Sequence, residues 1–292
     1  MKQIKINFDK EDIVQGQVPP LSNDKSLLEL RIKFFKNHDN QTMKYIPSAY
    51  EDFITAFEKS INENTSFSVI GLENFVQKDV IVGCTHFIDE MIMTHGLENI
   101  QHFGGYNYYK RLNANIKHVT LETLSKGKPL ILEYPFPRFG NKHIEYESII
   151  KKCNDQDIDV YLDCAWLPVS WNLKLDLNEP CIKGAAMSLS KCFGLHWSRI
   201  GVRWLKETKQ DSIWLQNQHN MISFPSVMLG KYYLDRIPFD YLVKKYKEKY
   251  FKICKFFNHK PGNTIMISHS DNYDQIYGIS NCLLKEHETD QD

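Results

Sequence analysis

Several features that mark whole classes of protein are missing from this sequence of 292 residues. Its 36 Lys and Arg residues balance its 36 Asp and Glu residues, so the chain lacks the basic charge typical of nucleic-acid-binding proteins. No apolar run approaches the roughly 20 residues of a membrane helix, and residues 1–8 lack the apolar core of a signal peptide. We therefore expect neither a nucleic acid nor a membrane as a partner.

Paired cysteines and the common cofactor motifs are also missing. The seven cysteines are odd in number and include no C-x-x-C pair, which argues against a zinc site or a thiol-exchange centre. They are predicted to be free thiols in a reducing compartment, so we expect the chain in the cytoplasm. No P-loop, G-x-G-x-x-G or H-E-x-x-H pattern occurs, so the corresponding phosphate, dinucleotide and zinc sites are not expected.

The composition is that of a globular protein, with 42% hydrophobic and 25% charged residues. Short β-rich runs alternate with helical patterns, which predicts an α/β fold with a mostly parallel sheet and helices on both faces. Residues 238–258 form the clearest helical pattern of the later part. We expect three regions: an N-terminal segment (1–45), a large domain (46–207) and a small, shortened, helical C-terminal domain (208–292).

Polar residues gather where three predicted strands end. The run GCTH at 83–86 follows one strand, Asp163 closes a second, and residues 188–191 follow a third. Ligands of open α/β sheets bind beyond the carboxyl ends of the strands, so we expect these residues in one site. The amides of a helix that begins at 84 favour an anion, although the run also fits a plain turn with Thr85 as the N-cap.

A carboxyl and an amine stand out at these strand ends. Asp163 ends an apolar strand, where a buried carboxylate needs a cationic partner; a structural ion pair or a helix cap is the alternative. Lys191 follows a run of small residues, and burial lowers the pKa of an amine and makes it a nucleophile toward carbonyls. Arg199 and Arg203 follow and are suitable ligands for a phosphate or a carboxylate.

The run SLSKCFGLHWSRIG at 188–201 closely resembles the cofactor-lysine segment of the pyridoxal-phosphate-dependent aminotransferases of classes I and II, which have fold type I. The run DCAW at 163–166 is similar to the Asp-x-Ala-Tyr of this family, and GCTHFID at 83–89 to its phosphate-binding turn. The run YNYY at 106–109 resembles the segment that carries the ring-stacking aromatic. The order and approximate spacing agree, and the resemblance covers roughly residues 45 to 205.

The resemblance implies pyridoxal 5'-phosphate as the cofactor. It implies that Lys191 forms the Schiff base, that Asp163 pairs with the pyridine nitrogen, that Tyr106 stacks on the ring, and that Trp166 lies at its phenol oxygen. It also implies an aminotransferase that moves an amino group from an amino acid or related amine donor to a keto acceptor, and a homodimer. The phosphate would be held by Gly83, Cys84, Thr85, His86, Ser188, Ser190 and Arg199.

The sequence departs from the family pattern at the phenol oxygen and near its end. Pro137 stands where an asparagine is expected, and Trp166 replaces a tyrosine that shares its task. Trp197 stands where a small glycine is common. No arginine follows Arg236, although the family's tail supplies one for the substrate carboxylate; the substitutes are Arg31, Arg138 and Arg203.

Four other interpretations remain open. The same residues could serve a decarboxylase or a lyase, or a protein that binds the cofactor without turnover. A plain α/β domain without cofactor explains each motif singly but not their shared order. The runs SLSK at 188–191 and SDN at 270–272 also match two motifs of penicillin-binding serine enzymes, with Ser188 as nucleophile, but the K-T-G motif does not follow.

Overall fold

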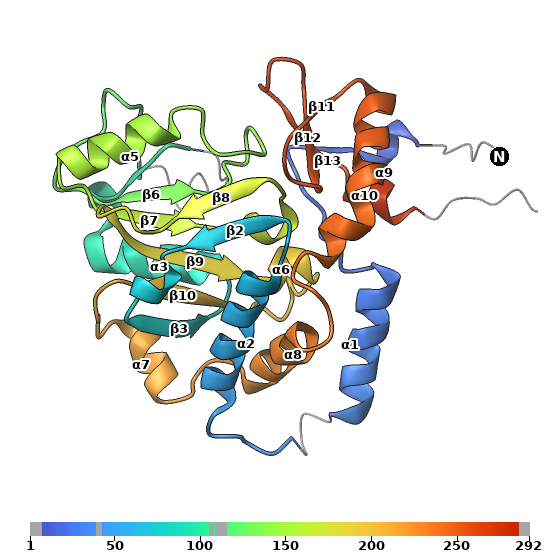
Figure 1. Cartoon of the computed structure of the whole chain (residues 1–292), viewed down its shortest axis with the longest axis horizontal. Coiled ribbons are helices and arrows are strands. Elements are labelled where there is room, and N and C mark those ends of the chain that lie inside the picture. Colours follow the sequence, from blue (N-terminus) through green and yellow to red (C-terminus); the bar gives the residue numbers. More distant parts are fainter. Residues whose placement is uncertain (1–7, 39–42, 105–107, 109–115, 286–292) are drawn as a thin grey trace, which may run out of the picture.

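The computed structural model describes residues 8–38, 43–104, 108 and 116–285. Its centre is a seven-stranded sheet in the order β3-β10-β9-β7-β6-β4-β5 (Figure 1). Strand β10 is antiparallel to both of its neighbours, and the other pairs are parallel, as the sequence predicted. The strands are β3 (Gln77–Ile81), β4 (Gln101–His102), β5 (Lys117–His118), β6 (Leu130–Glu133), β7 (Val160–Asp163), β9 (Ile182–Ser188) and β10 (Gly201–Leu205).

Helices cover both faces of this sheet. Side chains alternate between faces along a strand, and in β7 Val160 and Leu162 belong to one buried cluster while Tyr161 belongs to another. Helices α3 (Cys84–His95) and α7 (Ser212–Gln218) contribute to the cluster of Tyr161. The opposite cluster contains residues of α2 (Ala49–Glu63), α5 (Tyr146–Asp155) and α8 (Phe224–Leu234). The predicted arrangement of helices is therefore confirmed.

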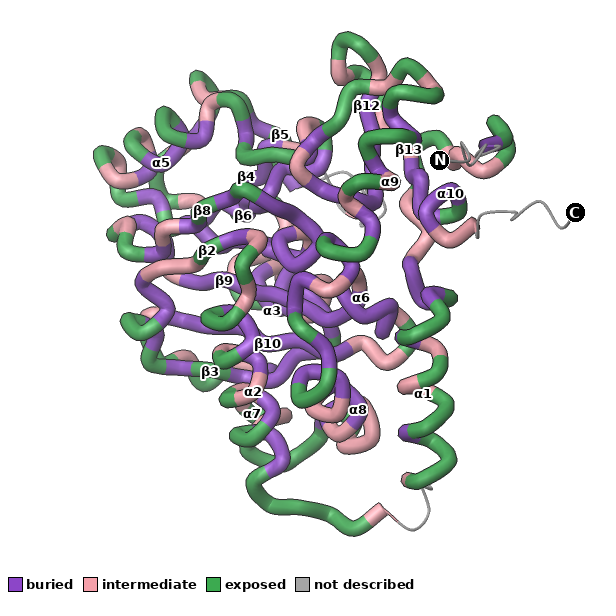
Figure 2. Tube along the Cα trace, turned by 45° about the vertical axis from the view of Figure 1, so that its right-hand side comes forward, coloured by how far each residue is buried: buried purple, intermediate pink, exposed green. Residues whose placement is uncertain are grey.

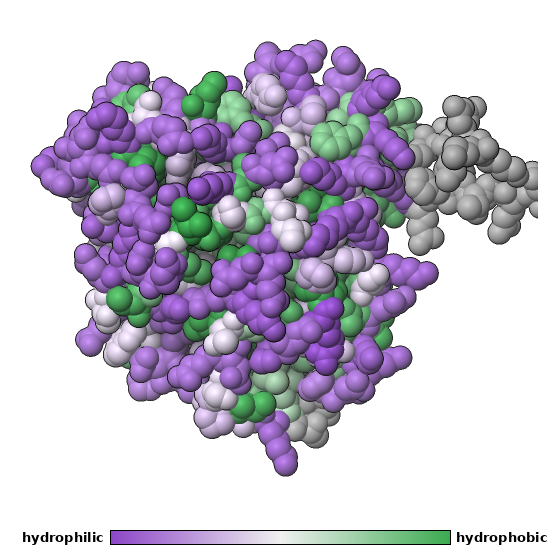
Figure 3. Space-filling view, viewed as in Figure 1, coloured by the Kyte–Doolittle hydropathy of each residue, from purple (hydrophilic) through white to green (hydrophobic). Residues whose placement is uncertain are grey.

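Small residues in β9 let the layers approach closely. A Cβ on Gly184 would lie 2.8 Å from Leu205 and 2.9 Å from Tyr161, so a larger residue would force neighbouring strands apart. A further parallel pair, β2 (Phe67–Ile70) and β8 (Leu173–Asp176), lies over the core on the α2 side. Figure 2 shows the central strands buried, whereas α1 (Lys25–Asn37) is largely exposed. The face in Figure 3 carries mostly hydrophilic side chains with scattered hydrophobic ones.

A second, smaller sheet lies beside the main one, at the upper right in Figure 1. Its order is β1-β13-β12-β11, and every pair is antiparallel. Strand β1 belongs to the N-terminal segment, so the two ends of the chain build this sheet together. The elements are β1 (Val14–Gln15), β11 (Lys260–Pro261), β12 (Ile267–His269) and β13 (Ile276–Gly278), with α9 (Tyr241–Phe257) and α10 (Ser280–Leu284) beside them.

A buried carboxylate ties the N-terminal segment to α9. Asp24 is fully buried and accepts a hydrogen bond from the Leu27 amide at the start of α1. It also accepts hydrogen bonds from Lys245 at 2.5 Å and from the Tyr246 hydroxyl at 2.6 Å.

Helices α7 and α8, which follow residue 207, pack against elements of the predicted large domain: α7 against β3 and α8 against α2. The expected boundaries at 45 and 207 therefore stay predictions.

None of the helices in the described ranges combines the length and the apolar character that a bilayer crossing requires.

Candidate active site

A pocket opens at the edge of the main sheet where β6, β7 and β9 end. Asp163 is the last residue of β7, and Ser188 is the last residue of β9. Strand β10 runs the other way, so Arg199, just before it, reaches the same edge. The empty space in the pocket and its open mouth is about 380 Å³. It is lined by Cys84, Thr85, Glu133, Pro137, Asp163, Ala165, Trp166, Ser188, Ser190, Lys191 and Arg199.

Eight of the predicted site residues line this pocket together: Cys84, Thr85, Asp163, Trp166, Ser188, Ser190, Lys191 and Arg199. They are far apart in the sequence, and the sheet brings them to one edge, as the strand-end rule predicts. Their convergence is the central geometric finding at this site.

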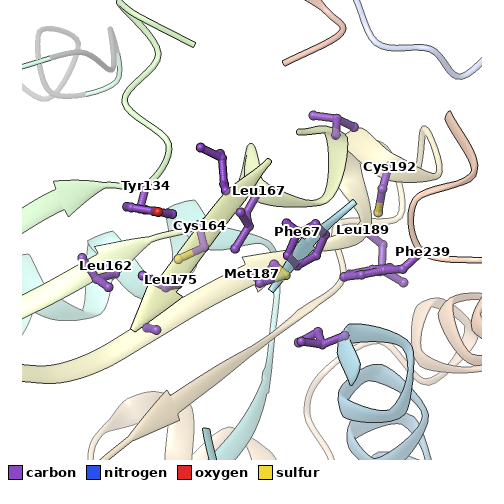
Figure 4. Packing of buried hydrophobic residues seen from close by; sticks show 14 of the residues in the cluster. Phe67, Tyr134, Leu162, Cys164, Leu167, Leu175, Met187, Leu189, Cys192 and Phe239 are labelled. Atoms are coloured by element: carbon purple, nitrogen blue, oxygen red, sulfur yellow. The ribbon is translucent and has the colours of Figure 1, made fainter. Parts of the chain in front are cut away.

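Apolar packing holds the polar edge in place from below. Leu189 and Cys192 are the first and last residues of the short helix α6 (Leu189–Cys192), which contains Lys191, and both are fully buried. Figure 4 shows their side chains among others of the core, with Met187 of β9 and Leu167 of the turn after β7. A lysine between two anchored neighbours has a fixed backbone position, which suits a group that must meet a ligand.

Lys191 is half-buried, and its amine lies 4.5 Å from the ring centre of Trp166. Burial lowers the pKa of Lys191, while the charge of Asp163 acts in the opposite direction. Because its pKa is lowered, a larger fraction of the amine is uncharged and nucleophilic at neutral pH. Trp166 gives the amine an apolar and polarisable wall.

Asp163 is buried at the bottom of the pocket, with 5% of its surface exposed. Its Oδ1 accepts a hydrogen bond of 2.9 Å from the Ala165 amide, which fixes the carboxyl plane. Burial raises the pKa of Asp163, and the charge of Lys191 and the Ala165 hydrogen bond act against the increase. A further cation in the pocket, such as a protonated ring nitrogen, would stabilise the ionised form of this buried carboxyl.

The start of α3 and Arg199 form a cradle for an anion. Gly83 has φ +74°, and a Cβ there would lie 2.8 Å from Nη2 of Arg199. That Nη2 donates a hydrogen bond to Oγ1 of Thr85 in the first turn of α3. The first amides of a helix have no acceptor within it, so amides, hydroxyl and guanidinium together favour a phosphate.

Ser190 supplies an independent observation that this pocket awaits a polar group. Its Oγ is buried and has no hydrogen-bond partner among the described residues. A buried hydroxyl without a hydrogen-bond partner destabilises the fold, and a bound ligand that forms a hydrogen bond with it would remove that cost. Ser188 is also buried and lies beside the thiol of Cys84, whose pKa burial raises, so that thiol stays protonated. The pocket fits a phosphorylated, cationic aldehyde, because it combines the anion cradle and the unpaired hydroxyl of Ser190 with Asp163 and Lys191.

Three predicted cofactor residues are not among the residues that line the pocket. Gly83 does not line it, although its close approach to Arg199 shapes the cradle. His86 does not line the pocket: the His86 amide donates to the Gly83 carbonyl at 3.0 Å, and Nδ1 of His86 accepts from the Val82 amide at 3.2 Å. Tyr106 lies outside the described residues. Their proposed roles at the phosphate and at the ring remain predictions.

Arg203 is wrong as a candidate ligand for the substrate. It is 1% exposed and lies between two carboxylates, 2.8 Å from Asp79 and 2.6 Å from Asp211. Arg31 lies instead over the exposed ring of Trp197, at 5.5 Å. Within the described ranges, the only cationic side chains that line the pocket are Lys191 and Arg199.

Sequence reasoning missed Glu133. It is the last residue of β6, is 1% exposed and lines the pocket. It pairs in register with Asp163 on β7, so the two carboxyls lie on neighbouring strands. The strand-end rule could have found it, because Glu133 follows the apolar run at 130–132 as Asp163 follows its own.

No protein-family model and no curated protein sequence matches this chain. Solved structures do match. Tyrosine aminotransferase from Leishmania infantum aligns with a TM-score of 0.63 and 9% identity, over 92% of this chain and 91% of that one. Alanine aminotransferase from Pyrococcus furiosus gives 0.61 and 12%, over 91% and 84%. Cystalysin from Treponema denticola, solved with pyridoxal 5'-phosphate, gives 0.64 and 13%, over 87% and 76%.

A PLP-bound C-S lyase from Staphylococcus hominis also aligns, with a TM-score of 0.56 and 12% identity, over 84% of this chain and 71% of that one. The likeness is therefore not confined to aminotransferases. At these identities, the comparison establishes the arrangement of the backbone. The chain has the fold of the pyridoxal-phosphate-dependent aminotransferases and C-S lyases of fold type I.

Proposed function

We propose that this chain is a pyridoxal-phosphate-dependent enzyme and that Lys191 carries the cofactor. The observation that supports this most strongly is the convergence of Lys191, Asp163 and the anion cradle in one pocket. The order of these residues in the chain agrees with the resemblance of segment 188–201 to the cofactor-lysine segment. When bound, pyridoxal phosphate supplies an electron sink for the bonds at the substrate's α-carbon.

Each residue has a task that follows from its surroundings. Asp163 holds the proton on the ring nitrogen, because its carboxyl is buried, oriented by the Ala165 amide and in need of a cation. Arg199, Thr85 and Ser190 bind the phosphate in the cradle. Nζ of Lys191 is the group that would hold the aldehyde carbon of the cofactor. The same amine, when it is free, would serve as the base that takes the proton from the substrate's α-carbon.

Aminotransfer between an amino donor and a keto acceptor is the reaction we favour. The resemblance of 188–201 supports it, and so do fold neighbours that are alanine and tyrosine aminotransferases. C–S bond cleavage is the second candidate, because other neighbours are C-S lyases. The reactions differ in what remains on the protein: a donor that transfers its amino group leaves the cofactor in the amine form, whereas elimination returns it to Lys191.

The cofactor assignment is tested by the absorbance of the purified protein with added pyridoxal phosphate. The parent should show a visible band that borohydride abolishes, and Lys191→Ala should show none. Lys209→Ala is the matched control, since the Lys209 amine bonds the Tyr161 hydroxyl at 2.7 Å and does not line the pocket. A band that persists in Lys191→Ala, or that Lys209→Ala loses equally, would contradict the assignment.

The reaction type is tested by adding amino donors singly to the loaded protein. Bleaching of the visible band, with recovery after a keto acid is added, is expected for aminotransfer. Release of ammonia and a thiol from a cysteine-type substrate, without lasting bleaching, would favour the lyase. Asp163→Ala should slow either reaction far more than it weakens cofactor retention. No change with any donor would favour a cofactor-binding protein without turnover.

Assembly and compartment are further proposals. We propose a homodimer, as the resemblance implies. All seven cysteines are free and buried, which is consistent with a reducing compartment such as the cytoplasm.

A further inference from the structure

Residues 135–140 form a wall segment that joins the pocket to the smaller sheet. The segment follows β6, and Pro137 within it lines the pocket. The residues of the anion cradle come from the ends of β9 and β10 and from α3, which follows β3. In the order of the main sheet, these strands and β6 lie on opposite sides of β7. Pro137 therefore belongs to the wall of the pocket that faces away from the cradle.

Backbone contacts fasten the wall segment to the chain around the smaller sheet. The Asn263 amide donates a hydrogen bond of 2.7 Å to the Gly140 carbonyl. Nε of Arg138 donates one of 3.1 Å to the Tyr273 carbonyl. A Cβ on Gly262 would lie only 2.9 Å from Cα of Gly140, so the two backbones pass in direct contact. The smaller sheet is therefore a support for this side of the pocket.

His269 lies at the centre of this contact. It is the last residue of β12 and is 0% exposed. A Cβ on Gly140 or on Gly262 would lie 3.0 Å from Cε1 of His269, so both glycines leave room for its ring. Nε2 of His269 lies 3.4 Å from the carbonyl oxygen of Pro137. That oxygen also accepts from the Gly140 amide at 3.3 Å, so the imidazole occupies its second acceptor position.

The protonation of His269 suits this contact. A carbonyl oxygen can only accept, so Nε2 must carry the proton of the hydrogen bond to Pro137. Burial lowers the pKa of His269, while hydrogen bonds to backbone carbonyls act against the decrease. A neutral imidazole has a single N–H, and the contact directs it to the residue of the wall segment that lines the pocket. His269 does not itself line the pocket, so it acts through Pro137.

We infer that His269 is a positioning residue of the active site, whose Nε2–H holds the Pro137 carbonyl and thereby fixes one wall of the pocket from the smaller sheet. The effect on the cofactor rests on the proposed function, because it requires pyridoxal phosphate in the pocket. In pyridoxal phosphate, the phosphate arm and the phenol oxygen lie on opposite sides of the aldehyde carbon. With the phosphate in the cradle, Pro137 borders the other side of the ring, so His269 controls how the ring is oriented and not how tightly the phosphate binds.

Three substitutions separate the N–H of His269 from the bulk of its ring. His269→Gln places an amide N–H near the position of Nε2, His269→Asn places one near Nδ1, and His269→Met fills the space without a donor. His259→Met is the matched control. His259 lies just before β11, where it forms a hydrogen bond of 2.8 Å with Oγ of Ser268 and stacks on Tyr277 at 4.2 Å, and it does not line the pocket.

The first measurement needs no cofactor. Hydrogen exchange of the peptide that covers residues 135–141 is followed by mass spectrometry in the unloaded protein. The Phe136 amide donates to the Asn141 carbonyl at 2.7 Å, so its exchange reports opening of the wall segment. Loss of one hydrogen bond should speed this exchange about 2- to 10-fold in His269→Met and His269→Asn. His269→Gln and His259→Met should exchange like the parent.

The second measurement is the visible circular dichroism of the loaded protein, together with its affinity for pyridoxal phosphate. His269→Met and His269→Asn should change the visible dichroic band, because the ring is no longer confined on the side of Pro137. Their Kd for pyridoxal phosphate should stay close to that of the parent, because the cradle is intact. His269→Gln and His259→Met should leave both the band and the Kd unchanged.

Unchanged exchange in His269→Asn and His269→Met would overturn the inference. Equal acceleration in His269→Gln or in His259→Met would also overturn it, because packing or general loosening of the smaller sheet, and not the N–H, would then hold the segment. Faster exchange with an unchanged dichroic band would show that the wall does not orient the ring. A parent without a visible band would refute the proposed function, whereas the exchange rates would still decide whether His269 holds the wall segment.

Discussion

Gly83 provides the most selective test of the anion cradle, because a single methyl group addresses one contact. Its φ of +74° is in the left-handed region, and the Cβ of an alanine would lie 2.8 Å from Nη2 and 2.9 Å from Cζ of Arg199. Gly83→Ala must therefore both strain the backbone and push the guanidinium away from Thr85. The backbone strain lowers the free energy of unfolding, whereas the displaced guanidinium weakens phosphate binding, so the two effects can be measured separately.

The chain offers a control for the backbone effect alone. Gly127 has nearly the same φ, +77°, but a Cβ there meets no described atom within 4 Å. An alanine at such a positive φ costs about 1–3 kcal/mol, so both variants should lose free energy of unfolding in urea. Gly83→Ala should lose at the upper end, because φ +74° with ψ 167° is a conformation that is essentially confined to glycine. Only Gly83→Ala should also lose the charge-assisted bond at the phosphate, worth about 1.5–3 kcal/mol, which weakens pyridoxal phosphate binding by roughly 10- to 150-fold.

The assay is a titration of each unloaded protein with pyridoxal phosphate, followed by absorbance. We expect parent and Gly127→Ala to have the same Kd and Gly83→Ala to bind far more weakly. Equal affinity in all three proteins would refute the cradle, since the phosphate would then not depend on Arg199. Equal weakening in both variants would show that backbone stability, and not the contact at Arg199, controls binding.

Two further predictions concern stability. Arg203→Leu leaves the buried carboxylate of Asp79 and the largely covered carboxylate of Asp211 without their cation and should lower the free energy of unfolding by about 3–5 kcal/mol. Asp24→Asn should lower it by about 1–3 kcal/mol at neutral pH. Burial acts to raise the pKa of Asp24, but its hydrogen bonds, led by Lys245, lower it below 3.8 overall. This stability is present above the ordinary carboxyl pKa and is lost as the pH falls through the folded value, so parent and variant should converge in acid.

Exposed residues of the same types serve as controls for both predictions, each measured by urea unfolding. Arg236→Leu and Asp235→Asn change side chains at the exposed end of α8 and should each cost less than about 0.5 kcal/mol. A loss for Arg203→Leu no larger than for Arg236→Leu would contradict the buried triad. A gap between the parent and Asp24→Asn that stays constant into acid would show that the charge of Asp24 does not stabilise the fold.

The sequence predicted the main sheet well because its signals are local. The strands expected before Gly83 and up to Asp163 are β3 and β7, and the helical pattern at 238–258 is α9. The pocket was also predicted, because polar residues directly after buried strands must meet at one edge of a parallel sheet. Both inferences need only a short window of sequence and one topological rule.

The smaller sheet could not be predicted in the same way. Strand β1 has two residues, and it pairs with β13 from the other end of the chain. Such short strands, partly exposed, carry no recognisable alternation, and their pairing depends on contacts far apart in sequence. The ion triad of Arg203 was missed for the same reason: a cation near a motif looks like a ligand until its partners, Asp79 and Asp211, are seen beside it.

The central claim is a covalent bond between the amine of Lys191 and the aldehyde carbon of pyridoxal phosphate. The most direct measurement is peptide mapping by mass spectrometry after the loaded protein has been reduced with borohydride and digested. We predict one phosphopyridoxyl group per chain, attached to Lys191. A group attached to any other lysine, or none above the level of a protein reduced without cofactor, would contradict the account.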